Sequence, residues 1–119
     1  FEVVMLGVGP DGHVASLFPG FPQLEVDDLI AVAVTGSPKP PPERVSLTLP
    51  ALNRARAVWF LATGPEKAAA VAAALAEESL AQAEESLPRA EESLPAARVR
   101  GRVTTTWFLD RAAAADIQP

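Results

Sequence analysis

Residues 1–20 read FEVVMLGVGPDGHVASLFPG, and this stretch decides the fold class. Its opening, Phe1–Leu6, is an almost unbroken apolar run, which is typical of a strand buried on both faces in a parallel sheet. A glycine-rich turn follows over residues 7–12. His13–Phe18 is then predicted as a short helix, ended by the Pro-Gly pair after it. We therefore expect a strand, a tight turn and a helix in that order.

The same alternation of strands and helices continues along the chain. Apolar or alternating runs predict strands, whereas proline-led or alanine-rich runs predict helices. The predicted strands are Leu29–Val34, Val45–Leu49, Ala57–Ala62 and Thr104–Leu109, and the predicted helical segments are Pro50–Ala55, Pro65–Leu75 and Asp110–Ala115, with Asp110 as an N-cap. Four prolines mark residues 36–42 as a loop. This order predicts an α/β fold in which helices flank a mostly parallel sheet.

Composition excludes several classes of function. The 119 residues include no cysteine, which excludes disulfide frameworks and thiolate metal sites, and no apolar run approaches the ~20 residues that span a bilayer. The net charge of −5 comes from residues 76–94, which hold six Glu and one Arg, while the remaining nine acidic and nine basic residues balance. We expect a cytoplasmic protein with no nucleic-acid and no membrane partner. Because the chain opens with Phe inside a predicted strand, we also expect a fragment of a longer protein.

Residues 76–96 are three tandem heptads, AEESLAQ, AEESLPR and AEESLPA. Ala76, Leu80 and their repeats alternate steps of four and three, as in the seam of a dimerising coiled coil. We favour a repeat that lengthens a surface connection, because Pro88 and Pro95 would each break a continuous helix. The first heptad is expected to extend the helix before it.

The segment after the heptads has two interpretations. Arg98, Arg100 and Arg102 alternate, so in a strand they would share one face. That face is either a phosphate-binding stripe or, as we favour, a solvated strand edge. For Thr104–Leu109, an apolar docking segment is the alternative to a last strand.

The glycine turn carries the strongest functional signal. Gly7, Gly9 and Gly12 match the dinucleotide fingerprint G-x-G-x-x-G, but the helix predicted after them is too short for that site. Glycines also expose backbone N–H groups, which suit an oxyanion or a phosphate. His13, the only histidine, lies at this turn, at the sheet edge where open α/β folds bind ligands. His13 is therefore a candidate catalytic residue.

Three stretches resemble one enzyme family. They are GVGPDGHVASLFPG at 7–20, KPPPERVSLTLPALNRARAVWFLATGPEKAAAV at 39–71 and the ending over 94–115. The chain resembles the 6-phosphogluconolactonases, part of a wider group that includes glucosamine-6-phosphate deaminases. The resemblance implies a Rossmann-like fold of the sugar-phosphate isomerase/lactonase type. It also implies hydrolysis of 6-phosphoglucono-δ-lactone to 6-phosphogluconate in the oxidative pentose phosphate pathway, with no metal and no organic cofactor.

The resemblance assigns roles to the turn. His13 would be the general base that activates water, and Asp11 would orient it or fix the turn. The N–H groups around Gly9 and Gly12 would bind lactone oxygens. A deaminase is the alternative within the group, but Phe18 stands where a deaminase would carry its catalytic Glu.

Basic residues would bind the substrate phosphate. By resemblance these are Arg44, which follows the proline-rich loop, and Lys67, in the turn that opens a helix. Lys39 is a weaker candidate in the loop, and Arg54 and Arg56 are expected to be surface charges. The partner is thus a small sugar-phosphate lactone.

The resemblance covers only part of a family member. An N-terminal half of the family, with a Ser-Gly-Gly loop and an Asp-Glu-Arg segment, has no counterpart in this sequence. We expect residues 1–119 to be the C-terminal part of one lactonase-like domain, with an acidic heptad insert at about 76–96. A truncated sheet would expose an apolar edge and face, which favours self-association or pairing with the missing half. A non-catalytic remnant that self-associates is the third hypothesis.

Overall fold

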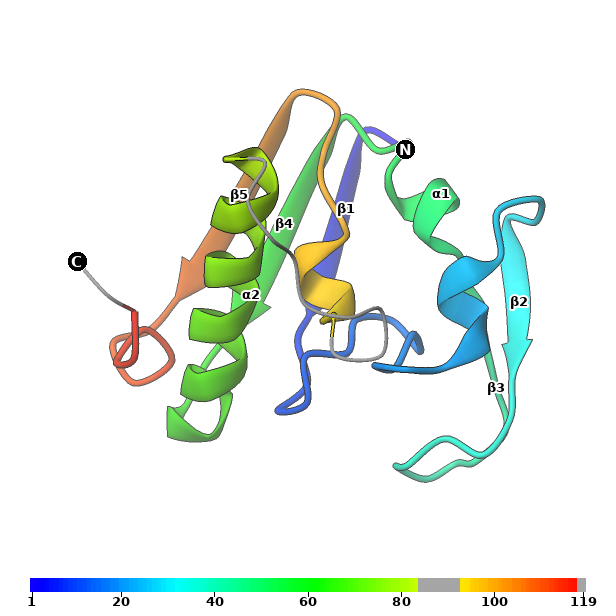
Figure 1. The fold of residues 1–119 in the computed structure, drawn as a ribbon, viewed down its shortest axis with the longest axis horizontal. Helices are drawn as coiled ribbons and strands as arrows, with labels where there is room; N and C mark the ends of the chain where they lie inside the picture. The colour runs from blue at the N-terminus through cyan, green and yellow to red at the C-terminus, as the bar shows by residue number, and fades with distance from the viewer. Residues whose placement is uncertain (84–92, 118–119) are drawn as a thin grey trace.

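A parallel sheet of three strands forms the centre of the computed structural model, which describes residues 1–83 and 93–117. The strands are β1 (Val3–Gly7), β4 (Ala57–Ala62) and β5 (Thr104–Leu109), in the order β1-β4-β5 (Figure 1). β4 pairs in parallel with both neighbours, so the carboxyl ends of all three strands lie together at the bottom of Figure 1. This confirms the α/β class and the predicted strands at the sheet centre.

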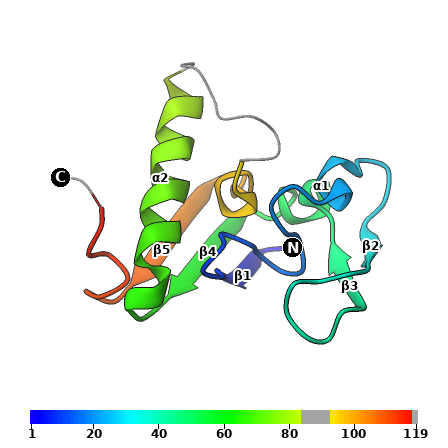
Figure 2. The same ribbon diagram turned by 60° about the horizontal axis from the view of Figure 1, so that its bottom comes forward.

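A small hairpin stands beside this sheet. It consists of β2 (Ala31–Val34) and β3 (Arg44–Leu47), which pair antiparallel on the far side of α1 (Figure 2). The helices are α1 (Leu49–Leu52) and α2 (Ala68–Gln82), with the 3-10 turns η1 (Pro22–Glu25), η2 (Pro65–Lys67) and η3 (Pro95–Ala97). The proline-rich loop predicted at residues 36–42 joins β2 to β3.

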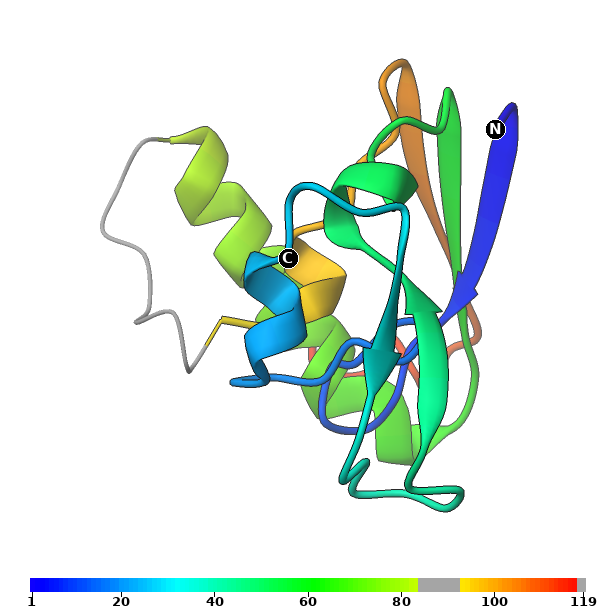
Figure 3. The ribbon, with the colours of Figure 1, turned by 90° about the vertical axis from the view of Figure 1, so that its right-hand side faces the viewer.

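The core lies between α2 and one face of the sheet. Val58 and Phe60 of β4 are fully buried there, together with Val71 of α2, and the Phe60 ring stacks on Trp107 with centroids 4.2 Å apart. Alternate strand residues point to this face because the side-chain period of a strand is two. Among the described residues, α2, η3, α1 and the hairpin all lie on the same side of the sheet (Figure 3).

The other sheet face is apolar and exposed. It carries Val3 and Met5 of β1, which are 43% and 61% exposed, and Trp59, Leu61 and Phe108 from the two neighbouring strands. We name these five residues the open face. The prediction that β1 is buried on both faces is therefore wrong, because no described element covers Val3 and Met5. The exposed apolar face expected of a truncated sheet is present.

The helix predicted over His13–Phe18 is absent. Ala15 has φ of +50°, a left-handed conformation that cannot continue a right-handed helix, and Val14 instead bridges to Leu17. Val14 and Leu17 are completely buried. This segment is a tight turn anchored in the core by its apolar side chains.

Two predictions near the C-terminus are also wrong. Arg98, Arg100 and Arg102 do not lie in a strand, because Arg98 ends η3 and the segment then crosses to β5 through Gly101. A Cβ at Gly101 would overlap the carbonyl oxygen of Thr104, which shows how sharply the chain bends there. Neither an arginine stripe nor a strand edge is formed.

Residues 111–116 form turns rather than the predicted helix. Asp110 nevertheless accepts the Ala113 N–H at 2.8 Å, as an N-cap does. The first heptad does extend α2, which continues to Gln82, as predicted. Most of the second heptad and the start of the third, residues 84–92, lie outside the described residues, so the coiled-coil interpretation stays untested.

Candidate active site

The turn after β1 is closed by its own backbone. Gly12 has φ of +86°, which favours glycine, and its N–H donates to the Gly9 carbonyl at 2.9 Å. The Gly9 N–H in turn donates to the His13 carbonyl at 2.9 Å. Both N–H groups expected to bind lactone oxygens are thus used inside the turn. No helix begins here, so the turn has no helix dipole to offer an anion.

His13 and Asp11 form a close pair within this turn. His13 Nδ1 lies 2.6 Å from Asp11 Oδ1, and the His13 backbone N–H donates to the same oxygen at 3.1 Å. The ring packs against Phe18, with centroids 4.7 Å apart. A proton on Nδ1 satisfies the carboxylate and leaves the Nε2 lone pair to accept a proton. The pair therefore has the arrangement of an oriented general base.

Gly9 makes room for the His13 ring. A Cβ at Gly9 would overlap Cε1 and Nδ1 of His13 and lie 2.8 Å from Asp11 Oδ1. Any side chain at this position would therefore displace the imidazole, the carboxylate or both. The second glycine of the motif thus serves the His13–Asp11 pair rather than a nucleotide.

The carboxyl group of Asp11 has a lowered pKa. Burial by itself raises the pKa of Asp11, but the hydrogen bonds from the backbone and ring of His13, and the ring's charge, lower it further than burial raises it. The carboxylate is consequently ionised at neutral pH, where it holds the His13 ring in one orientation.

A cavity of about 440 Å³ opens beside this pair, at the carboxyl end of the sheet. Its walls are β1, the turn and two lysines; the lining residues are Met5, Leu6, Gly7, Val8, Gly9, His13, Ala15, Lys39 and Lys67. The site thus combines one imidazole with two ammonium groups. Among the described residues, no three His, Asp or Glu side chains come together as metal ligands.

Lys67 reaches the cavity from the end of η2. Its Nζ donates to the Val8 carbonyl at 2.6 Å, which ties the turn after β4 to the turn after β1. Asp110, at the end of β5, accepts the Gly64 N–H at 3.2 Å and so holds the same turn from its other side. Adjacent parallel strands bring these loops together, because their carboxyl ends share one edge.

Arg44 lies outside the cavity lining, and its guanidinium contacts backbone instead. It donates to the carbonyls of Lys39, Pro40 and Pro41 at 2.9, 3.0 and 3.0 Å. It also lies over the Phe18 ring, 5.5 Å from the centroid. Arg44 therefore fixes the proline-rich loop from which Lys39 lines the cavity.

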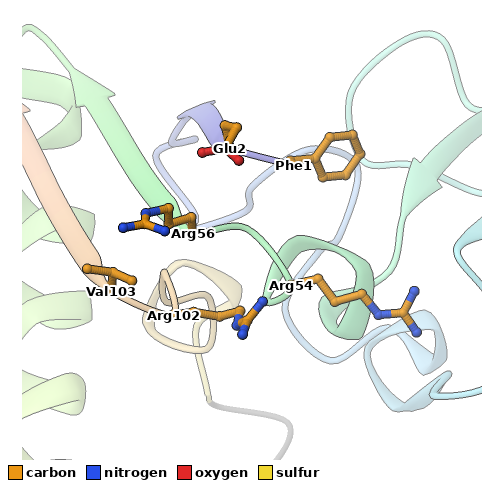
Figure 4. A pocket seen from close by; sticks show the side chains of 6 residues that line it. All are labelled: Phe1, Glu2, Arg54, Arg56, Arg102 and Val103. Atoms are coloured by element: carbon orange, nitrogen blue, oxygen red, sulfur yellow. The ribbon is translucent and has the colours of Figure 1, made fainter.

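A second cavity, of about 510 Å³, lies at the opposite end of the sheet. Phe1, Glu2 and Arg56 line it, with Arg54 and Arg102 (Figure 4). In Figure 4 the guanidinium groups of Arg54 and Arg56 point in different directions, and both side chains are exposed. They lie far from His13 in the chain's fold, in keeping with the expectation that they are surface charges.

The sequence predicts part of this arrangement of residues. It predicted His13, Asp11, Gly9 and Lys67, which the structure brings together. It ranked Lys39 below Arg44, although Lys39 lines the cavity. It did not predict the link between Asp110 and Gly64, since no sequence pattern marks contact between two loops that far apart.

The chain as a whole is similar in sequence and fold to known proteins. Residues 1–107 match the family model described as glucosamine-6-phosphate isomerases/6-phosphogluconolactonase. The chain belongs to this family. The 6-phosphogluconolactonases of Streptomyces coelicolor and Homo sapiens are 51% and 47% identical to it, over 98% and 96% of the chain. Among the described residues, no helix is long and apolar enough to cross a membrane.

Solved structures of the family share the fold. The 6-phosphogluconolactonase of Trypanosoma brucei matches 99% of this chain with a TM-score of 0.79 and 31% identity. A monomeric glucosamine-6-phosphate deaminase matches with a TM-score of 0.63 at 20% identity, a likeness of fold alone.

The chain is much shorter than these family members. It spans 41% of the Streptomyces protein, 40% of the human protein and 43% of the Trypanosoma chain. More than half of each relative therefore lies outside the part compared.

Proposed function

We propose that this chain carries the general base and the phosphate-binding lysines of a 6-phosphogluconolactonase. The reaction is the hydrolysis of 6-phosphoglucono-δ-lactone to 6-phosphogluconate in the oxidative pentose phosphate pathway. The observation that carries the proposal is the 2.6 Å contact of His13 Nδ1 with Asp11, beside a cavity that two lysines line. The lactonase names of the relatives agree with it.

In this mechanism His13 Nε2 takes a proton from water as the oxygen attacks the lactone carbonyl carbon. Asp11 stabilises the imidazolium that results, because its carboxylate accepts a hydrogen bond from the Nδ1–H group, which keeps its proton. The tetrahedral intermediate collapses as the bond to the ring oxygen breaks, and the imidazolium returns its proton to that oxygen. Water is consumed, and the products are a hydroxyl group and a carboxylic acid, which ionises.

Lys39 and Lys67 bind the phosphate in this proposal. Each ammonium group offers three donors, of which Lys67 uses one for the Val8 carbonyl. Arg44 supports binding by holding the Lys39 loop and by adding positive charge near it. Gly9 and Gly12 serve by shaping the turn, since their own N–H groups are occupied.

A deaminase is less well supported. Phe18 occupies the position where that group would carry its catalytic Glu, and the phenyl ring is 1% exposed beneath His13. A buried apolar ring offers no proton acceptor. The lactonase assignment therefore has the stronger chemical basis.

We also propose that the working enzyme needs more polypeptide than this chain. The open face is apolar, and within residues 1–83 and 93–117 β1 has a neighbouring strand on one side only. Relatives that contain this same sheet have more than half their residues elsewhere. We propose that the part of a family member that this chain does not match pairs with the free edge of β1 and covers the open face. A cytoplasmic location is likewise a proposal, compatible with the lack of cysteine.

The test is hydrolysis of freshly prepared 6-phosphogluconolactone above its spontaneous rate. His13→Ala is expected to lower kcat by about 10²–10⁴-fold, because a general base contributes that much. Arg54→Ala, at the opposite end of the sheet, is the control and should keep the wild-type rate. Equal rates for wild type and His13→Ala, in a preparation that is active, would refute the role of His13.

A further inference from the structure

Glu77 is a carboxylate on the buried side of α2. The core-facing positions of this helix include Ala70 and Ala74, and Glu77 continues the same stripe one turn further on. Its side chain is buried, with the residue only 9% exposed. Burial of a carboxylate lowers the stability of the fold unless hydrogen bonds replace the water that the carboxylate loses.

Both oxygens of Glu77 are bound by residues near the end of the third heptad. Oε2 accepts the Ser93 hydroxyl at 2.7 Å, and Oε1 accepts the Leu94 N–H at 3.1 Å. Hydrogen bonds to an ionised acceptor are stronger than those between neutral groups. Glu77, in the first heptad, therefore holds the end of the third heptad by hydrogen bonds. We name residues 93–96 the clasped segment.

The clasped segment covers the turn that carries His13. A Cβ at Gly12 would lie 2.8 Å from Leu94 Cδ2, so the Leu94 side chain rests directly on Gly12. Two residues on, the Ala96 N–H donates to the Gly12 carbonyl at 3.1 Å. Figures 1 and 2 show η3 between α2 and this turn. Gly12 is thus held from the side of α2 as well as from within its own turn.

We propose that Glu77 is a positioning residue for His13, acting through Leu94 and Gly12. Its carboxylate fixes Leu94, Leu94 and Ala96 fix Gly12, and Gly12 precedes the imidazole. The effect of Glu77 on catalysis rests on the proposed function, whereas its effect on the position of the His13 ring does not. The neighbouring Glu78 is a matched control, because it pairs with Arg100 at 3.4 Å and not with the clasped segment.

The test uses the full chain and reads His13 directly by NMR. Since His13 is the only histidine, its ring gives a single set of signals. Glu77→Ala should shift these signals, and it should speed exchange of the Ala96 amide by about tenfold or more relative to the Phe60 amide in the core. Glu77→Gln should restore both, because the amide can accept from Leu94 and donate to Ser93. Glu78→Ala should change neither.

A purely structural role predicts a different result. Glu77→Ala would then speed exchange at Ala96 and Phe60 alike and leave the His13 signals of the folded protein unchanged, which would overturn the proposal. Leu94→Ala is the second variant should Glu77→Ala not fold, because it uncovers Gly12 without exposing an unpaired carboxylate. It must shift the His13 signals too; unchanged signals would also overturn the proposal. None of these measurements needs lactonase activity. They therefore test the role of Glu77 even if the proposed function is wrong.

Discussion

At the scale of single residues, the lowered pKa of Asp11 links stability to pH. The folded state holds the Asp11 proton less tightly than the unfolded state does, so this carboxylate stabilises the fold above the unfolded pKa of about 3.9. That contribution is lost as the pH falls through the folded pKa, below which both states are protonated. The carboxylate is 38% exposed, so solvent screening keeps the contribution under about 1 kcal/mol.

Asp11→Asn should therefore be less stable than wild type above about pH 5, by less than about 5 °C in Tm. The difference should shrink as the pH falls below the unfolded pKa of about 3.9 and through the lower folded pKa, because the wild-type carboxyl then becomes protonated. Thermal unfolding followed by circular dichroism from about pH 2 to pH 7 measures it. A Tm difference that does not change with pH would contradict the assigned direction of the shift.

Gly9 offers a steric test of the same pair. Gly9→Ala should displace the His13 ring, since the new Cβ would overlap it, and should lower kcat by about tenfold or more. The His13 ring signals in NMR report the displacement independently of activity. Gly7→Ala is the control for the ring signals alone, because a Cβ at Gly7 meets nothing within 4 Å but Gly7 lines the cavity. If both variants leave the ring signals at their wild-type positions, the proposed packing is wrong.

At the scale of elements, Arg44 connects the proline-rich loop to the turn after β1. Arg44→Lys keeps the charge but loses the planar set of donors that reaches three carbonyls. The loop and Lys39 should then be less fixed, and KM for the lactone should rise about 3–30-fold with a smaller change in kcat. Arg56→Lys, at the other end of the sheet, should leave KM unchanged. A fall in kcat at constant KM would argue against a binding role.

The elements also show which features of the fold the sequence can predict. Ala57–Ala62 was predicted to the residue because its apolar run has one interpretation. Residues 13–18 were predicted as a helix because their apolar spacing permits one, whereas burial of Val14 and Leu17 imposes the φ of Ala15. Hydrophobic pattern therefore predicts elements held by local periodicity and fails where tertiary packing decides the backbone.

At the scale of the whole molecule, the sequence pattern likewise does not predict those site residues that only tertiary packing brings together. The sequence predicts His13 at the carboxyl edge of the sheet, and in the structure the turn with Lys67 reaches the same edge because β1 and β4 are parallel. Lys39 and Leu94 reach the site through contacts between segments distant in sequence, which no local pattern encodes. Glu77 shows the difference most clearly. It is one of six Glu in residues 76–94, and nothing in the repeat distinguishes it from the others, whereas the fold shows it buried.

The open face allows the last prediction, which concerns the complete enzyme. Co-expression with the part of the Streptomyces relative that this chain does not match should give a complex of one copy of each, with lactonase activity above that of this chain alone. Leu61→Lys should weaken the complex, because it places a charge on the open face among apolar side chains.

Solution mass from light scattering and the lactone assay together decide the outcome. Arg54→Lys, away from the open face, is the matched control and should leave assembly intact. A dimer of this chain that persists in the presence of the added part would mean that a second copy covers the open face. Full activity of the monomer by itself would mean that the site around His13 is complete without a second copy and without the added part of the relative. Both results would contradict the proposed pairing, since it requires the apolar face and the strand edge of β1 to be occupied by the rest of a family member.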